Sequence, residues 1–209
     1  AESTSAAPTA TWTPPPPPPK TWPLTGVVVA NPVDRPALAV KIENSIDARP
    51  QTGLNAADMV WEEVVEGGIT RYVAVYQSGV PAEIGPVRSV RPMDPAIAAP
   101  LHGLLAFSGG QPQYIDAATA AGLQVVSNDA GAGGFSRTTS RRAPHNVYAS
   151  PETLVAQADD AHRAVDVAQR GQVAGGVVEA GQLLLAAAQV GLAALHHRLV
   201  LGAGGGQVA

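Results

Sequence analysis

The clearest pattern of apolar and polar positions lies between residues 58 and 77. Two runs rich in Val, Trp and Tyr, residues 58–66 (DMVWEEVVE) and 69–77 (ITRYVAVYQ), are separated only by Gly67 and Gly68. Glycine readily adopts the positive φ of a tight turn, so two such runs around a Gly-Gly pair are typical of a β-hairpin. We therefore expect an antiparallel pair of strands joined by a two-residue turn.

This turn would decide which side chains face each other across the hairpin. Glu62 and Glu66 would lie on one face with Arg71 diagonally between them, within reach of both carboxylates. The opposite face would be apolar and suited to the core, with Glu63 as its single charged member. Pairing with Arg71 is the structural explanation for the two glutamates, and a site that uses their carboxylates is the functional one.

Shorter apolar runs predict the other elements. We expect strands at residues 37–43, 104–107, 123–126 and 146–149, and helices at 96–101, 114–121 and from Pro151, with Ser150 as the N-cap. The segments 45–56, 81–95 and 127–143 have the composition of loops. Strands and helices that are mixed after an antiparallel pair favour an α+β fold, with a mixed sheet, a central antiparallel hairpin and flanking helices.

The two ends of the chain differ in composition from the middle. Residues 1–22 are rich in Ala, Ser, Thr and Pro, and the run Pro14–Pro19 favours a disordered, Pro-rich tether with stiff polyproline segments. Residues 164–209 consist mainly of Ala, Gly, Val, Leu and Gln, without any aromatic residue. We therefore expect the folded domain at residues 23–163, followed by a low-complexity tail.

The tail has two explanations. Wrong reading frames of a GC-rich gene yield Ala, Gly, Val and Arg, so we hypothesise that a frameshift produced residues 164–209. The alternative is a low-complexity tail that is expressed as such.

Composition and charge exclude several classes of protein. A net charge of −4 does not fit a nucleic-acid binder with a basic stripe. The absence of Cys removes disulfides, thiolate zinc sites and Cys nucleophiles, and no second His is spaced to share a metal with His145. We predict neither a metal nor a cofactor. Because the chain begins at Ala1 instead of Met, we expect that an upstream segment, such as a signal peptide or one that ends in a lipidated Cys, precedes it in the full product.

Four polar clusters could carry chemistry. They are Asn44 with Arg49 and Gln51; Asp58, Glu62, Glu66 and Arg71; Arg88, Arg91 and Asp94; and Arg141, Arg142, His145 and Asn146. For catalysis we predict Glu62 or Asp94 as acid or base with His145 assisting, because a carboxylate can orient an imidazole as a general base.

Arginines dominate the predicted binding residues. The set is Arg49, Arg71, Arg88, Arg91 and Asn146. The planar fork of a guanidinium suits a carboxylate or a phosphate, and the prolines around Arg88 and Arg91 limit the backbone before any ligand arrives. The alternative is that Arg88 and Arg91 pair with Asp94 and the hairpin acids.

The four clusters, in this order along the chain, resemble those of the YerB-like lipoprotein family, whose domain of unknown function is designated DUF3048. The matching stretches are PLTG (23–26), residues 35–78, GPVRSVRPMD (85–94), FSGGQP (107–112) and FSRTTSRRAPHNVYAS (135–150). The resemblance implies an exported, extracytoplasmic envelope protein, usually held to the membrane by a lipid, with an α+β fold and no established reaction. The family continues into a second domain, which residues 164–209 do not resemble.

Three roles remain open. The first is a binding module of the cell envelope, which holds an anionic or glycan wall ligand or an envelope partner protein. The second is a hydrolase or transferase that acts on envelope polymers with carboxylate and His residues as acid and base. The third is a structural role for the polar clusters. A site is favoured if one cleft is lined by Glu62, Arg71, Arg88, Asp94 and His145.

Overall fold

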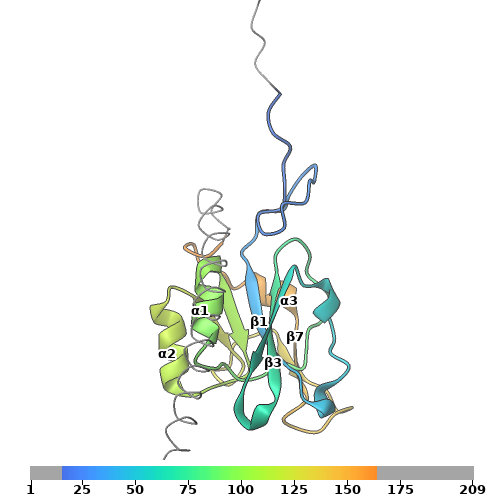
Figure 1. Ribbon diagram of the computed structural model, residues 1–209, viewed down its shortest axis with the longest axis vertical. Helices are drawn as coiled ribbons and strands as arrows, with labels where there is room; N and C mark the ends of the chain where they lie inside the picture. Colours follow the sequence, from blue (N-terminus) through green and yellow to red (C-terminus); the bar gives the residue numbers. More distant parts are fainter. Residues whose placement is uncertain (1–15, 164–209) are drawn as a thin grey trace, which may run out of the picture.

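The predicted strands form one five-stranded mixed sheet in the computed structural model, which describes residues 16–163 (Figure 1). In spatial order the strands are β2 (Met59–Val64), β3 (Thr70–Tyr76), β1 (Leu38–Glu43), β4 (Leu104–Phe107) and β5 (Gln124–Ser127). β3 pairs antiparallel with both β2 and β1, whereas the β1–β4 and β4–β5 pairs are parallel. The predicted α+β class and mixed sheet are confirmed.

The hairpin of β2 and β3 lies at one edge of the sheet, which corrects the predicted central position. β1 pairs with the inner side of β3, and β4 pairs with the other side of β1. All residues of β1 are buried, whereas β2 alternates between exposed and more buried residues. A strand that is apolar and covered on both faces belongs in the middle of a sheet, and an alternating strand tolerates the edge.

The turn of the hairpin is one residue longer than predicted. It consists of the 3-10 helix η3 (Glu66–Gly68), whose two glycines adopt positive φ values of 71° and 72°. Because the extra turn residue shifts the register by one position, Glu63 lies opposite Arg71. The predicted pairing of Arg71 with Glu62 and Glu66 is therefore wrong.

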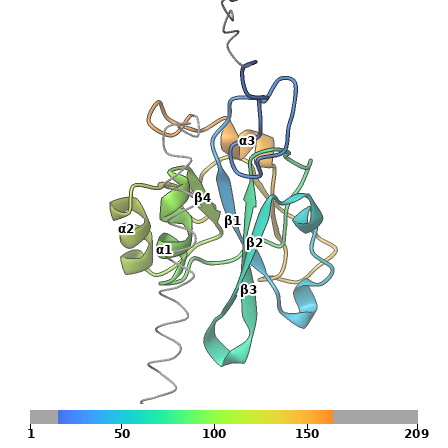
Figure 2. The same ribbon diagram turned by 45° about the horizontal axis from the view of Figure 1, so that its top comes forward.

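Helices cover one face of the main sheet, and a small second sheet with a helix covers the other (Figures 1 and 2). The first layer contains α1 (Asp94–Ala98), η4 (Ala99–Leu101) and α2 (Pro112–Ala120). The second contains β6 (Phe135–Arg137), β7 (Val147–Ala149) and α3 (Pro151–Val155). Two short helices, η1 (Ile46–Ala48) and η2 (Leu54–Ala56), lie between β1 and β2. β6 corrects the loop predicted for residues 127–143, because pairing with β7 makes a strand of this segment.

Alternation along β1 directs its side chains into both layers. Ala39 packs in the cluster beneath α1 and α2, whereas Val40 packs in the cluster beneath β7 and α3. Lys41 and Glu43 also lie on this covered strand and are 0% and 2% exposed. Two charged side chains at the centre of the sheet require partners inside the protein.

The two ends of the chain lie mainly outside the described range. The predicted tether at residues 1–22 is described only from residue 16, and the tail at 164–209, with its frameshift hypothesis, is not described. Within residues 16–163, no helix is long and apolar enough to span a bilayer.

The described N-terminal segment has a small fold of its own before β1. Thr21 and Val28 form an antiparallel bridge, and the Arg35 guanidinium lies 5.7 Å from the centroid of the Trp22 ring. Residues 16–33 lie near the start of β1 (Figure 1), and Leu24 packs against the core cluster that includes Ala39.

Gly103 permits a close approach of β1 and β4, and this approach can be tested. A Cβ at Gly103 would overlap the carbonyl oxygen of Ala37, which accepts a hydrogen bond from the Leu104 N–H at 2.9 Å. We expect Gly103→Ala to lower the free energy of unfolding by about 1–3 kcal/mol, because the backbone must move to admit the methyl group. Gly133→Ala is the control, since a Cβ there meets no atom within 4 Å. Urea unfolding measures both variants, and equal stabilities would contradict the close approach.

Candidate functional site

A buried ion pair joins β1 to the start of α1. The Lys41 ammonium donates to Asp94 Oδ1 at 2.7 Å, and both side chains are 0% exposed. Lys41 Nζ also contacts the Glu63 carboxylate on β2. The backbone N–H of Arg91 donates to Asp94 Oδ2 at 2.6 Å. One ammonium and two carboxylates thus form a closed group that connects β1, β2 and α1.

Burial opposes the charges of this pair. It lowers the pKa of Lys41 to about 8, although the attraction of Asp94 acts in the opposite direction. It also raises the pKa of Asp94 above its ordinary value, with the attraction of Lys41 opposing that shift. Asp94, predicted as an acid or base, has no exposed surface, and we interpret the pair as a connection within the core.

A second buried carboxylate, that of Glu43, gathers residues from three segments. Glu43 Oε1 lies 2.9 Å from His145 Nδ1 and accepts a hydrogen bond from the Ser45 hydroxyl, also at 2.9 Å. Arg88 Nε lies 3.6 Å from the same oxygen, and the Glu43 side chain is 3% exposed. Glu43 Oε2 has no hydrogen-bond partner in the described part of the chain. Two predicted site residues, His145 and Arg88, therefore meet at a carboxylate that was not predicted.

Arg71 lies on β3 directly opposite Glu43. It is 4% exposed, and its Nη1 donates to the carbonyl oxygen of Ser89 at 2.8 Å. Burial, with the positive charges of Arg91 and Arg88, lowers the pKa of Arg71 to about 10, while Glu43 acts in the opposite direction. The Arg71 guanidinium thus offsets buried negative charge and presents little surface to a ligand.

The segment that carries Arg88 runs between the ends of β1 and β4. The backbone N–H of Arg88 donates to the carbonyl oxygen of Lys41 at 2.8 Å, and the Arg88 carbonyl accepts from the Ser108 N–H at 3.0 Å. These bonds continue the sheet beyond the last β1–β4 pair. The Arg88 side chain, which is 25% exposed, is therefore held beside Glu43 at the surface.

A pocket of about 470 Å³ lies beside His145, in the loop before β7. Its lining residues are Asp47, Ser140, Arg141, Arg142, Ala143 and His145. The Arg141 guanidinium donates to the carbonyl oxygens of Asp47 and Pro50, each at 2.8 Å, and fastens the loop to the chain around η1. The side chain of Arg142 forms no hydrogen bond or ion pair with another residue of the 16–163 range. Its guanidinium is therefore available to a ligand.

Glu62 and Arg49 belong to a separate network on the opposite face of the hairpin. Glu62 Oε1 accepts hydrogen bonds from Asn44 Nδ2 at 3.2 Å and from the Thr70 hydroxyl at 2.7 Å. Arg49 Nε donates to Asn44 Oδ1 at 3.0 Å. The predicted catalytic residues therefore do not line one cleft.

Arg91 contacts the turn of the hairpin, and Asn146 contacts residues of the neighbouring β6 segment. Arg91 Nε lies 2.8 Å from the Glu66 carboxylate, as the ion-pair alternative expects. A backbone hydrogen bond, together with Arg91, holds the pKa of Glu66 below its ordinary value. Asn146 accepts a hydrogen bond from Arg137 at 2.9 Å and donates to the Thr138 carbonyl at 3.2 Å, within the β6–β7 pair and its turn.

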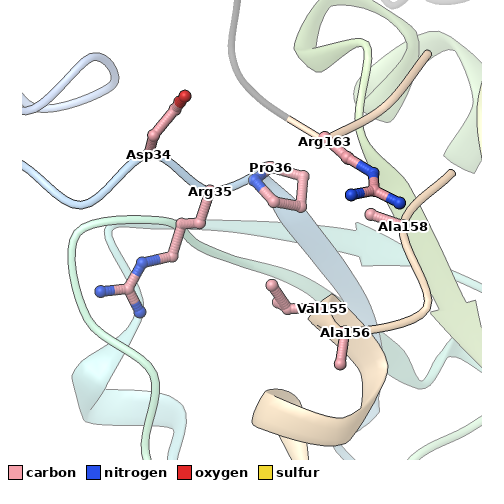
Figure 3. Close-up of a pocket in the computed structure, with 7 residues that line it drawn as sticks. All are labelled: Asp34, Arg35, Pro36, Val155, Ala156, Ala158 and Arg163. Carbon is pink, nitrogen blue, oxygen red and sulfur yellow. The ribbon is translucent and has the colours of Figure 1, made fainter. Parts of the chain in front are cut away.

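A second pocket, of about 380 Å³, opens between the chain before β1 and the end of α3 (Figure 3). It combines small apolar residues with Arg35 and Arg163, and Figure 3 shows the Arg35 side chain directed away from Arg163. Arg35 lies over Trp22, and Arg163 pairs with Asp160 at 2.9 Å. Arg35 Nε has no hydrogen-bond partner in the described part of the chain, but the Arg35 side chain is directed away from Arg163. The residues that line this pocket include no histidine and no pair of carboxylates, so we take the pocket beside His145 as the candidate site.

Lys41 and Glu43 are the site residues that sequence reasoning missed. Both stand in the run ALAVKIE, whose apolar pattern predicts a strand without indicating which face each charge meets. Glu63 offered a signal, because a single charge on an otherwise apolar face needs a buried partner of opposite sign. That partner is Lys41.

Removal of one member of the Lys41–Asp94 pair should destabilise the fold strongly. Lys41→Met leaves Asp94 buried without its ammonium, and we expect a loss of about 3–5 kcal/mol in the free energy of unfolding. Asp94→Asn should have a similar effect, and the double variant should lose less than the sum of the two. Urea unfolding measures all three, and strictly additive losses would contradict a direct interaction.

Comparisons with known proteins agree with the resemblance seen in the motifs. Residues 24–164 match the family described as "Protein of unknown function (DUF3048) N-terminal domain". The chain is 34% identical over 132 residues to "Putative lipoprotein YerB" of Bacillus subtilis strain 168, a match that covers 61% of this chain and 39% of that protein. The crystal structure of YerB from Bacillus subtilis matches 65% of this chain and 47% of the YerB chain, with 31% identity and a TM-score of 0.60. The chain thus spans less than half the length of this relative, and it belongs to the DUF3048 family.

Proposed function

We propose that this domain is an envelope-associated, extracytoplasmic module that binds an anionic group of a wall polymer or an envelope partner. The location is supported by the similarity to a relative whose name describes a lipoprotein, a class that a lipid holds to a membrane. The single observation that supports an anionic ligand is Arg142, a residue that lines the pocket beside His145 and whose guanidinium has no hydrogen bond or ion pair elsewhere in residues 16–163.

The division of roles between two adjacent arginines supports an anionic ligand. Arg141 is committed to two backbone carbonyls, so Arg142 is the group that can meet a phosphate or carboxylate with paired hydrogen bonds. Arg88 adds positive charge nearby, since it shares Glu43 with His145. Asp47 also lines the pocket and carries a negative charge, so the two arginines Arg141 and Arg142 outnumber the one carboxylate among its lining residues.

The second candidate function is a hydrolase or transferase that acts on the same polymers. The contact between His145 and the buried Glu43 favours it, because a buried carboxylate on one ring nitrogen is the arrangement of an oriented general base. In this candidate Glu43 takes the role first assigned to Glu62 or Asp94.

Titration of the full chain with poly(glycerol phosphate), a soluble anionic polymer, tests the binding proposal. We expect Arg142→Ala to weaken binding about tenfold or more, because hydrogen bonds to charged groups contribute about 1.5–3 kcal/mol. Added salt should weaken the binding of the parent chain, since the pocket is open to solvent. Isothermal calorimetry measures both effects.

Arg163→Ala is the matched control, because it removes an arginine from the other pocket. It should bind the polymer as tightly as the parent chain does. Dextran of similar length is the uncharged ligand control and should not bind. Equal affinity of Arg142→Ala and the parent chain, or equal binding of dextran, would sink the proposal.

A further inference from the structure

We infer that Glu43 and His145 form an acid–base dyad, with which the pocket hydrolyses a phosphodiester of the bound polymer. The inference rests on the proposed function for the binding of an anionic ligand, and it adds a reaction. It starts from one juxtaposition. His145 contacts a buried carboxylate through one ring nitrogen, and it lines the same pocket as the unpaired Arg142.

Glu43 determines which nitrogen of His145 can act as a base. An ionised carboxylate only accepts hydrogen bonds, so the 2.9 Å contact with Glu43 Oε1 requires the proton on His145 Nδ1. The neutral imidazole then carries its lone pair on Nε2. Because the Glu43 side chain is 3% exposed, water competes little for this contact, and the ring is held in one orientation.

The Nε2 side of the ring remains available. The His145 side chain is 24% exposed, and Nε2 lies 4.0 Å from Asp47 Oδ2, beyond hydrogen-bond distance. Nε2 has no hydrogen bond to any residue in the described part of the chain. A water molecule that enters the pocket can therefore donate to this nitrogen.

The charge of Glu43 is offset by Arg71 and Arg88, but these arginines do not explain its contact with His145. A structural role for that contact would be to tie the loop before β7 to β1, but Arg141 already fastens this loop through two hydrogen bonds. Burial of a carboxylate has an effective cost of several kcal/mol unless the geometry and hydrogen bonding are excellent. Glu43 Oε2 has no partner in residues 16–163, so the fold does not use its full hydrogen-bonding capacity.

Among anionic groups, a phosphodiester suits both the guanidinium of Arg142 and hydrolysis by the dyad. A carboxylate would offer Arg142 a charge but no bond that water cleaves. A phosphodiester offers both in one group, since its non-bridging oxygens suit the guanidinium and its phosphorus accepts an attacking oxygen. A phosphate bound to Arg142 would lie in the pocket that His145 also lines.

The reaction balances with water as the only co-reactant. His145 Nε2 takes a proton from water while the water oxygen forms a bond to phosphorus. The bond from phosphorus to the ester oxygen on the opposite side breaks, the leaving alkoxide takes a proton from solvent water, and the imidazolium releases its proton to solvent. The products are a phosphate monoester and an alcohol. His145 is the catalytic residue, Glu43 is a positioning residue, and Arg142 stabilises the negative charge on the phosphoryl oxygens.

Hydrolysis of bis(p-nitrophenyl) phosphate by the full chain tests the dyad. We expect steady release of p-nitrophenol and a fall in kcat of about 10²–10⁴-fold in His145→Gln, the range for loss of a general base. Glu43→Gln should lower kcat with little change in KM, because it affects the ring and not the ligand. Arg142→Ala should raise KM and lower kcat, because it removes both a binding group and charge stabilisation in the reaction, and Arg163→Ala should match the parent chain.

Two further readouts separate a positioning role from a structural one. The double variant Glu43→Gln/His145→Gln should be no slower than His145→Gln alone, because Glu43 acts only through His145. Near-UV circular dichroism reports whether each variant is folded. If Glu43→Gln does not fold, His145→Gln still tests the base, because His145 is partly exposed at the pocket.

The outcomes distinguish this inference from the proposed function. A folded parent chain that binds poly(glycerol phosphate) but releases no p-nitrophenol would overturn the dyad and leave the binding module intact. A chain that does neither would overturn both. Full activity in His145→Gln would also overturn the dyad.

Discussion

The burial of charge on a strand covered on both faces is the constraint on which the rest of this structure depends. β1 lies in the middle of the sheet and carries Lys41 and Glu43 among apolar residues. Lys41 is matched by Asp94 at the start of α1 and by Glu63 on β2. Because an uncompensated buried charge is strongly destabilising, these contacts favour a single placement of the edge hairpin and the helical layer relative to β1.

The two charges of β1 differ in how completely they are enclosed. The group around Lys41 is sealed, since neither Lys41 nor Asp94 has exposed surface. The group around Glu43 opens on one side, where His145 and Arg88 each keep about a quarter of their side-chain surface exposed. Lys41 thus lies in the closed interior of the protein. Glu43, the next residue on the same face of β1, contacts side chains at the surface. The packing of the core and the geometry of the candidate site therefore both depend on residues of β1.

Local patterns predicted much of the fold and less of the site. The apolar runs correctly placed β1, β4 and the β2–β3 hairpin, because burial and turn residues act over short stretches of chain. They did not predict the three-residue turn, since two glycines fit either length. This one extra residue places Glu63 opposite Arg71, where a position diagonal to both Glu62 and Glu66 was predicted. The contact of His145 with Glu43 joins residues 102 positions apart, and no local sequence pattern predicts a contact across such a separation.

The loop that forms the pocket is fastened by Arg141 through neutral carbonyl oxygens and not through carboxylates. Ion pairs at a surface weaken as salt rises, whereas hydrogen bonds to neutral carbonyls depend much less on ionic strength. The walls of the pocket should therefore keep their shape as the ionic strength changes, while the charge of Arg142 is screened by added salt. The shape of the pocket and its charge thus depend on two neighbouring arginines, so a change in ionic strength can alter the charge without altering the shape.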